Sequence, residues 1–164
     1  MSTRKQSSGF TLIELMVTVA LVGVVAAFAI PSFTTMIANS RLVSTSNDIV
    51  GALNYARSEA VKAGRRVIVN PTDGASWANG ISVWIDSNSN GSMQDSEELR
   101  RTSRAPGTVT ITSSSNVAFT GGGLLPGGSV AVTIQVCDSR TGESGSEITV
   151  TLGGGIRSKD YTCG

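Results

Sequence analysis

A loop in the middle of the chain carries oxygen-bearing side chains at the spacing of calcium-binding loops. The spacing fits Asp-x-Asn-x-Asn-Gly-x5-Glu, and the candidate calcium ligands are Asp86, Asn88, Asn90, Ser92 and Glu97. Calcium needs several oxygen ligands and a sharp turn, which alternating acids and amides around a glycine supply. However, strands rather than helices are expected on both sides, and Asn and Gly also make hairpin turns without metal. We therefore favour a plain turn, with calcium as the alternative and no other cofactor expected.

A single carboxylate interrupts the longest apolar run of the chain. Residues 10–30 contain one charged side chain, Glu14, and a helix of that length spans roughly 30 Å, about the thickness of a bilayer's hydrocarbon core. Arg4 and Lys5 precede the run without an acid, which favours a cytoplasmic N-terminus. An ionised acid at mid-membrane costs about 2.5–3.5 kcal/mol, and less near the end of the segment. Glu14 is therefore expected to have a partner.

Three interpretations compete for this segment. In a simple signal anchor, Glu14 would reach the lipid headgroups. In a cleaved secretory signal, Ala27-Phe28-Ala29 would be the cleavage site, although the run is longer than the usual ~7–15 apolar residues and a charge interrupts its start. The third interpretation, which we favour, rests on Gly9-Phe10-Thr11-Leu12-Ile13-Glu14. With its basic leader and with Pro31 further down, this stretch resembles the class III leader junction of type IV pilins and type II secretion pseudopilins.

The resemblance implies a processing site and an assembly residue. In such proteins a prepilin peptidase cuts between the residues matched by Gly9 and Phe10 and methylates the new amino terminus. The carboxylate matched by Glu14 then pairs with the terminal amine of a neighbouring subunit in the filament. Such a pair would offset the cost of burying the acid.

Composition argues against an enzyme. The chain has no His, which excludes His-based triads, imidazole general bases and His-ligated metals, and its two Cys are too few for a Cys-only structural zinc site. No phosphate-cradling glycine motif and no nucleophile elbow occurs. The 13 basic and 12 acidic side chains nearly cancel.

The elements that hold these residues follow from hydrophobic periodicity. Pro31 lies inside a helical pattern and predicts a kink. Beyond it, apolar residues recur at three and four, apart from a weak turn at 44–47, which predicts an amphipathic helix ending at Gly64. Alternating runs predict strands, with no helical pattern between them, so the sheet is expected to be antiparallel. The predicted strands are 67–69, 81–85, 99–102, 109–112, 117–119, 130–136 and 148–152.

The predicted fold class is α+β, a pilin fold by resemblance, with a long N-terminal helix packed on an antiparallel β-sheet body. The expected divisions are a cleaved leader (1–9), a transmembrane segment (10–30), the amphipathic half of the helix (31–64) and a periplasmic β-rich domain (65–164). In the periplasm Cys137 and Cys163 are expected to form a disulfide. It would close a loop of about 27 residues, worth roughly 3.5 kcal/mol in chain entropy. Two free buried thiols are the alternative.

In the predicted β-rich domain and the helix before it, the resemblance is to a more specific family. The helix segment Leu53-Asn54-Tyr55-Ala56-Arg57-Ser58-Glu59-Ala60, a Trp-containing strand and the 86–91 loop are similar to the FimT/FimU and GspH family, nearest the FimU side. This implies a minor pilin that primes and joins a type IV pilus, with an H-type minor pseudopilin of type II secretion as the alternative. The implied partners are other minor and major pilins, the inner membrane, prepilin peptidase and the pilus assembly platform.

The C-terminal tail gives a weak indication of DNA binding. Gly154-Gly155-Ile156-Arg157-Ser158-Lys159 resembles the Gly-Arg-x-Arg stretch that DNA-binding FimT proteins use in natural transformation. Gly155 occupies the first Arg position, which leaves Arg157 and Lys159. Near-neutral charge offers little of the attraction on which non-specific DNA binding rests. We therefore favour a solvated strand end, with a DNA receptor as the alternative.

Overall fold

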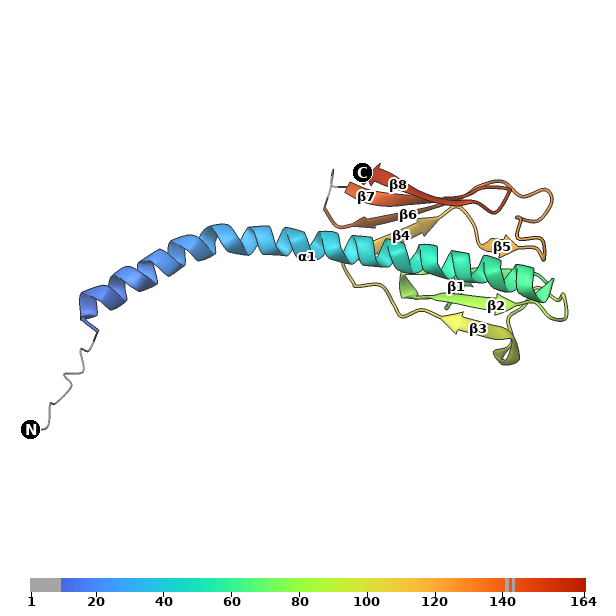
Figure 1. Cartoon of the computed structure of the whole chain (residues 1–164), viewed down its shortest axis with the longest axis horizontal. Helices are drawn as coiled ribbons and strands as arrows, with labels where there is room; N and C mark the ends of the chain where they lie inside the picture. The colour runs from blue at the N-terminus through green and yellow to red at the C-terminus, as the bar shows by residue number, and fades with distance from the viewer. Residues whose placement is uncertain (1–9, 141, 143) are drawn as a thin grey trace, which may run out of the picture. The chain divides into compact units, whose positions relative to one another are not determined.

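The computed structural model describes residues 10–140, 142 and 144–164. Within them, one long helix, α1 (Leu12–Ala63), precedes a body of β-strands (Figure 1). The chain divides into two units, the first ending at Ala38 and the second running from Asn39 to Gly164. Because α1 crosses this boundary, each unit holds part of the helix. The predictions for residues 1–9, including Gly9 and the leader, lie outside the described residues.

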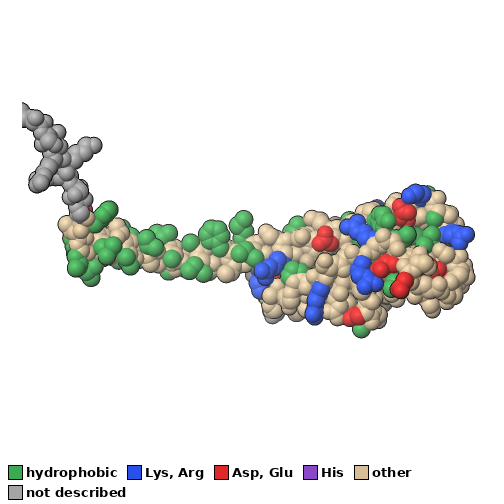
Figure 2. Space-filling model, turned by 90° about the horizontal axis from the view of Figure 1, so that it is seen from below, with side chains coloured by type: hydrophobic (Ala, Val, Ile, Leu, Met, Phe, Trp, Pro, Cys, Tyr) green, Lys and Arg blue, Asp and Glu red, His purple; other side chains and the backbone are tan. Residues whose placement is uncertain are grey.

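The first unit is the apolar part of α1. Its large apolar side chains, from Phe10 to Ile37, are 50–86% exposed in the isolated chain. Figure 2 shows hydrophobic side chains gathered along this part of the helix. By length and composition, α1 is long and apolar enough to cross a membrane. The helix continues through Pro31, whose carbonyl oxygen accepts hydrogen bonds from the hydroxyls of Thr34 and Thr35 (2.8 and 3.2 Å). Apolar surface of this extent indicates a contact with lipid or protein.

The second unit contains two four-stranded antiparallel sheets among its described residues. The first sheet has the order β3-β2-β1-β5, and the second has the order β4-β6-β7-β8. Consecutive strands β4 and β5 belong to different sheets, so the chain crosses from one sheet to the other between them. The strands are β1 (Val67–Pro71), β2 (Ile81–Ile85), β3 (Glu98–Arg101), β4 (Val109–Ser113), β5 (Val117–Phe119), β6 (Val132–Asp138), β7 (Ser144–Val150) and β8 (Ile156–Thr162).

The remainder of α1 packs on these sheets and forms the core with them. Apart from the adjacent pair Ala52 and Leu53, its buried apolar residues recur at three, four or seven positions, which places them on one helical face. They contact inward-facing residues of both sheets in a single cluster, to which the helix contributes Leu42, Ile49, Ala52, Leu53, Ala56 and Ala60. Gly64 ends the helix with a φ of 64°, and the Arg65 N–H donates to the Ala60 carbonyl (3.3 Å). This is the Schellman type of helix ending, for which glycine is suited.

The fold differs from the sequence-based expectation in three respects. The body has two sheets rather than one, and β8 is an additional strand where only a strand end was expected. The predicted helix is continuous through 44–47, where its apolar pattern is weak, and the polar residues Thr45 and Ser46 are buried there. Two short 3-10 helices, η1 (Trp77–Asn79) and η2 (Asp95–Glu97), lie in the connections on either side of β2.

Candidate functional site

The start of α1 is closed by reciprocal hydrogen bonds between Thr11 and Glu14. The Thr11 N–H and hydroxyl both donate to Glu14 Oε2 (2.9 Å each), and the Glu14 N–H donates to the Thr11 hydroxyl (3.3 Å). This arrangement is a capping box, which satisfies N–H groups that a helix leaves unpaired at its start. The assembly residue expected from the sequence therefore has a partner within its own chain.

Sequence reasoning did not single out Thr11, although Thr-x-x-Glu before an apolar run is a capping signature. The Glu14 carboxylate also lies at the positive end of the helix dipole. Phe10 directly precedes the cap and is 86% exposed in the isolated chain. Glu14 is thus held at the helix start, close in sequence to Phe10, which is the predicted N-terminus of the mature chain.

The candidate calcium ligands lie together in the connection between β2 and β3. Trp84 of β2 pairs with Glu98 of β3, so the antiparallel register brings the two ends of the loop, Asp86 and Glu97, close to each other. Glu97 Oε1 accepts a hydrogen bond from the Ser87 N–H (2.9 Å), which ties the last loop position to the second. Asp86 accepts from the Gly91 N–H. The exposed side chains of Asn88, Asn90 and Ser92 occupy the loop between them.

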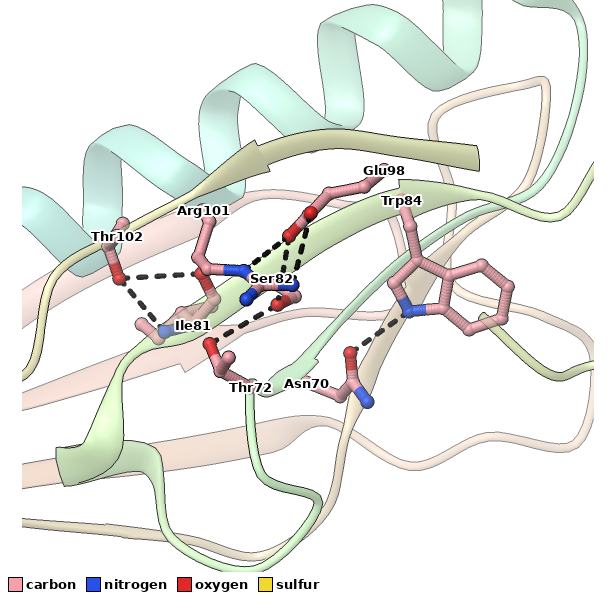
Figure 3. Close-up of polar contacts among 8 residues, drawn as sticks. All are labelled: Asn70, Thr72, Ile81, Ser82, Trp84, Glu98, Arg101 and Thr102. Atoms are coloured by element: carbon pink, nitrogen blue, oxygen red, sulfur yellow. Dashed lines mark hydrogen bonds and ion pairs between the residues drawn. The ribbon is translucent and has the colours of Figure 1, made fainter. Parts of the chain in front are cut away.

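Side chains on one face of the first sheet tie the loop-bearing strands together (Figure 3). Ser82 of β2 is fully buried, and its hydroxyl lies 3.2 Å from Thr72 Oγ1 and 3.4 Å from Glu98 Oε1. Arg101 of β3 donates from Nε and Nη2 to the two carboxylate oxygens of Glu98 (2.7 and 3.1 Å). The Ser82–Glu98 contact joins β2 to β3, the strand that follows the loop, and the Arg101–Glu98 pair within β3 orients the Glu98 carboxylate for it.

Cys137 and Cys163 form a disulfide, with their Cα atoms 5.9 Å apart. Cys137 lies in β6 and Cys163 follows β8, so the bridge crosses the intervening strand β7. It crosses at Gly145, where a Cβ atom would lie 2.5 Å from the Sγ of Cys163 and 3.1 Å from that of Cys137. Only a residue without a side chain fits under the bridge, and the sequence pattern gave no indication of this requirement.

Arg57 of α1 connects the helix to two glycine-rich turns. Its Nε donates to the Gly123 carbonyl (3.0 Å) and its Nη2 donates to the Gly153 carbonyl (3.3 Å). Gly154 packs against the Gly123 carbonyl so closely that a Cβ atom would overlap it. Arg57 therefore positions both turns.

The candidate DNA-binding residues lie on β8, the edge strand of the second sheet. Both Arg157 and Lys159 are exposed. Lys159 Nζ forms an ion pair with Glu147 Oε1 of β7 (2.8 Å), and Gln135 Nε2 donates to the other oxygen (3.2 Å). These two hydrogen bonds hold the pKa of Glu147 below its ordinary value. Because Glu147 neutralises Lys159, this face of the sheet carries little net positive charge.

Two known families match this chain, one in the body and one at the N-terminal segment. The family described as type II transport protein GspH matches residues 45–154, and the prokaryotic N-terminal methylation motif matches residues 4–30. The chain belongs to the GspH family. Two fimbrial proteins of Pseudomonas aeruginosa are each 37% identical to it over 68 residues, which is 42% of this chain and 44% of each relative. The chain thus matches less than half the length of these curated relatives.

Two crystal structures of the type IV minor pilin FimU from Pseudomonas aeruginosa (strain PAO1) have a similar fold to this GspH-family chain. In one crystal form the TM-score is 0.62 over 77% of this chain and 97% of FimU, and in the other it is 0.59 over 75% and 100%. Sequence identity is 22% in both, so the likeness concerns the fold. It confirms the predicted α+β pilin fold. Because pilin-family proteins are structural proteins, the chain is not an enzyme.

Proposed function

We propose that this GspH-family chain is a minor pilin that primes assembly of a type IV pilus and becomes part of the filament. The observation that carries the proposal is the exposed apolar surface from Phe10 through the first part of α1 to Ile37, with one carboxylate, Glu14, near its start. Such a helix suits a bilayer while the subunit is stored and a bundle of similar helices once the subunit is assembled. In this proposal the inner membrane holds the helix, and the second unit lies in the periplasm.

The methylation motif at residues 4–30 supports a processing step. Prepilin peptidase would hydrolyse the peptide bond between Gly9 and Phe10, and the freed amine of Phe10 would be methylated. This amine would lie one residue before the Thr11–Glu14 cap. During assembly, Glu14 would exchange the donors of its own cap for the amine of a neighbouring subunit, which supplies the opposite charge that a buried carboxylate requires.

The proposed partners are other minor and major pilins and the pilus assembly platform. FimU is a type IV minor pilin and the curated relatives are fimbrial proteins, and both likenesses favour the pilus over a secretion system. A second candidate function is that of an H-type minor pseudopilin in type II secretion. The description of the family that matches residues 45–154, a type II transport protein, favours this candidate.

One deletion strain tests both candidates. Deleting the gene should remove most sheared surface pili and leave the amount of type II-secreted protein unchanged, and the wild-type gene should restore the pili. Mass analysis of the restored protein should find a mature chain that starts at methylated Phe10. A start at Ile30 would instead indicate cleavage by signal peptidase after Ala29.

The reverse pattern, normal pili with lost secretion, would replace the pilus proposal by the pseudopilin. Co-purification from detergent extracts then identifies the partners, which should be other minor pilins in the first case and secretion pseudopilins in the second. A protein that co-purifies with neither group, in a strain with normal pili and normal secretion, contradicts both candidates.

A further inference from the structure

Two carboxylates of the β2–β3 loop are buried without a cation. Asp86 and Glu97 are 4% and 3% exposed. Neither forms an ion pair with another residue in the described part of the chain. Arg65 reaches this loop, but its Nη1 donates to the backbone carbonyl of Ser87 (2.6 Å). Since a buried carboxylate is stable only beside an opposite charge or a full set of donors, these two acids require a further partner.

The hydrogen bonds of the two acids are also incomplete. Among the described residues, Asp86 Oδ1 and Oδ2 share a single donor, the Gly91 N–H, at 3.4 and 3.3 Å. Glu97 Oε1 is satisfied by the Ser87 N–H (2.9 Å), but the buried Oε2 has no hydrogen-bond partner among the residues that the structure describes. Because Ser87 is the second residue of the loop, its bond to Oε1 turns the Glu97 carboxylate toward the loop. Oε2 is then an acceptor without a donor at the loop's edge.

A self-contained turn accounts for the amides of the loop but not for its acids. Asn88 Oδ1 accepts from the Asn90 N–H (3.0 Å), and Asn90 Oδ1 accepts from the Ser92 N–H (2.8 Å). Such bonds form in many turns and leave each amide oxygen a second lone pair. Gly91, with a φ of 72°, provides the sharp turn at the sixth position of the loop. Nothing in a plain turn explains why Asp86 and Glu97 are buried.

We propose that this loop binds a calcium ion, with Asp86 and Glu97 as its charged ligands. The amide oxygens of Asn88 and Asn90 and the backbone carbonyl of Ser92 would complete the protein ligands, and water would fill the rest of a shell of roughly six to eight oxygens. The ion would supply the charge that both acids lack and the partner that Glu97 Oε2 lacks. The proposal does not depend on whether the chain enters a pilus or a pseudopilus.

The charge of the site sets its expected affinity. The loop offers two carboxylates as ligands, and no group of three or more His, Cys, Asp or Glu side chains forms a metal cluster in the described ranges. Sites of low ligand charge bind calcium weakly, and extracellular modules have dissociation constants of about 10⁻⁴–10⁻³ M. Magnesium, which requires near-octahedral ligands, should bind less well.

The test measures calcium binding and melting temperature on the full chain in detergent. Unfolding is followed by the fluorescence of Trp77 and Trp84, both of which are buried. At constant ionic strength, 10 mM CaCl2 should raise the melting temperature by about 5 °C relative to EGTA, from mass action on the folded state. Calorimetric titration with CaCl2 should give one site, and MgCl2 at the same concentration should give less than half the shift.

Three variants locate the effect. Glu97→Gln keeps the shape of the side chain and should weaken calcium binding at least tenfold. Asn90→Ala changes an exposed ligand, so that a loss of calcium response cannot be attributed to a damaged core. Asp95→Asn is the matched control, because it removes one negative charge from an exposed, non-ligand position of the same loop. It should keep the full shift.

The outcomes separate the site from general effects of the ion. A shift in the wild type and in Asp95→Asn that disappears in Glu97→Gln and Asn90→Ala supports the proposal. The absence of heat and of any shift in the wild type at 10 mM CaCl2 overturns it. An equal shift in all four proteins overturns it as well, since the ion would then act elsewhere.

Discussion

The guanidinium of Arg57 donates a 3.0 Å hydrogen bond to the backbone carbonyl of Gly123, 66 positions further along the chain. The same side chain reaches the Gly153 carbonyl (3.3 Å), so one helical residue fixes two adjacent turns that are far apart in sequence. One of these turns follows β5 in the first sheet and the other precedes β8 in the second. Arg57 therefore couples α1 to both sheets through their connections rather than through their strands.

Replacing Arg57 by Ala should lower the free energy of unfolding by about 1.5–3 kcal/mol, because hydrogen bonds from charged groups contribute about this much and the two carbonyls lose their donor. Arg57→Lys should fall between wild type and Ala, since an ammonium group lacks the planar fork that spans both carbonyls. Denaturant unfolding of the full chain in detergent measures both. Arg41→Ala, an exposed residue of the same helix, is the control and should change the stability little. Equal losses in Arg57→Ala and Arg41→Ala would contradict the coupling.

Gly145→Ala should destabilise the chain by about 1–3 kcal/mol, the usual cost of forcing extra volume into a packed site. The new methyl group would press on the Sγ atoms of Cys137 and Cys163 and on the Val136 carbonyl. Gly107→Ala, at a position with open space around it, is the matched control and should be neutral. Thermal unfolding and a thiol count on the protein unfolded without reductant measure the two effects. The count should be near zero in wild type and higher in Gly145→Ala.

Removing the disulfide isolates its part of this effect. Replacing Cys137 and Cys163 by Ser should cost roughly 3.5 kcal/mol, the chain entropy of a loop of about 27 residues. In that background Gly145→Ala should cost less than it does with the bridge present, because the side chains would no longer be held against Gly145. Additive losses would show that the clash with the Val136 carbonyl alone decides the effect.

The turn after β1 should make the stability of the fold depend on pH in the acidic range. The backbone N–H groups of Ser76 and Ala75 and the side chain of Asn79 donate to Asp73, which lowers its pKa from 3.8 to about 2. A carboxyl with a lower pKa in the folded state stabilises the fold fully above pH about 4 and loses this contribution as the pH falls toward 2. Asp73→Ala should therefore lower the melting temperature at pH 6 and have little effect at pH 2. Asn79→Ala should show a smaller change of the same sign, and a pH-independent loss would contradict this cause.

Periodicity predicted the elements that bury one face. The apolar spacing along α1 and the glycine at 64 predicted the bounds of the helix to within a few residues. The spacing was visible because one stripe of the helix is buried against the sheets. Strand β8 was missed for the opposite reason. It is an edge strand with exposed polar side chains on both faces, such as Arg157 on one and Ser158 on the other, and it is held by main-chain pairing with β7. An exposed edge strand buries neither face, so apolar and polar residues need not alternate along it. Its sequence therefore lacks the pattern from which a strand is predicted.

Sheet membership could not be predicted, because it depends on contacts far apart in sequence. Strand β5 pairs with β1, and the register joins Val67 to Phe119. At the site, the spacing of the loop from Asp86 to Glu97 was visible in the sequence. The burial of its two acids was not, since it follows from the pairing of β2 with β3.

The helix start supports a prediction that separates charge from capping. Glu14→Gln can still close a capping box with Thr11, because an amide oxygen accepts the same hydrogen bonds. It cannot neutralise the amine of a neighbouring Phe10. Membrane insertion should be unchanged or improved, since an ionised acid in the segment opposes insertion. Assembly should fall on the order of 100-fold or more, because removing one partner of a buried ion pair costs about 3–5 kcal/mol.

Thr11→Ala is the matched opposite of Glu14→Gln, since it removes the cap and keeps the charge. It should cost about 0.5–2 kcal/mol of helix stability and leave pili within about tenfold of wild type. Thr18→Ala, about two turns further along the exposed helix, controls for loss of a hydroxyl. Counts of sheared pili and the membrane-bound fraction of each protein measure assembly and insertion separately. If Glu14→Gln assembles normally while Thr11→Ala does not, the carboxylate acts in assembly through its own helix rather than through a neighbour's amine.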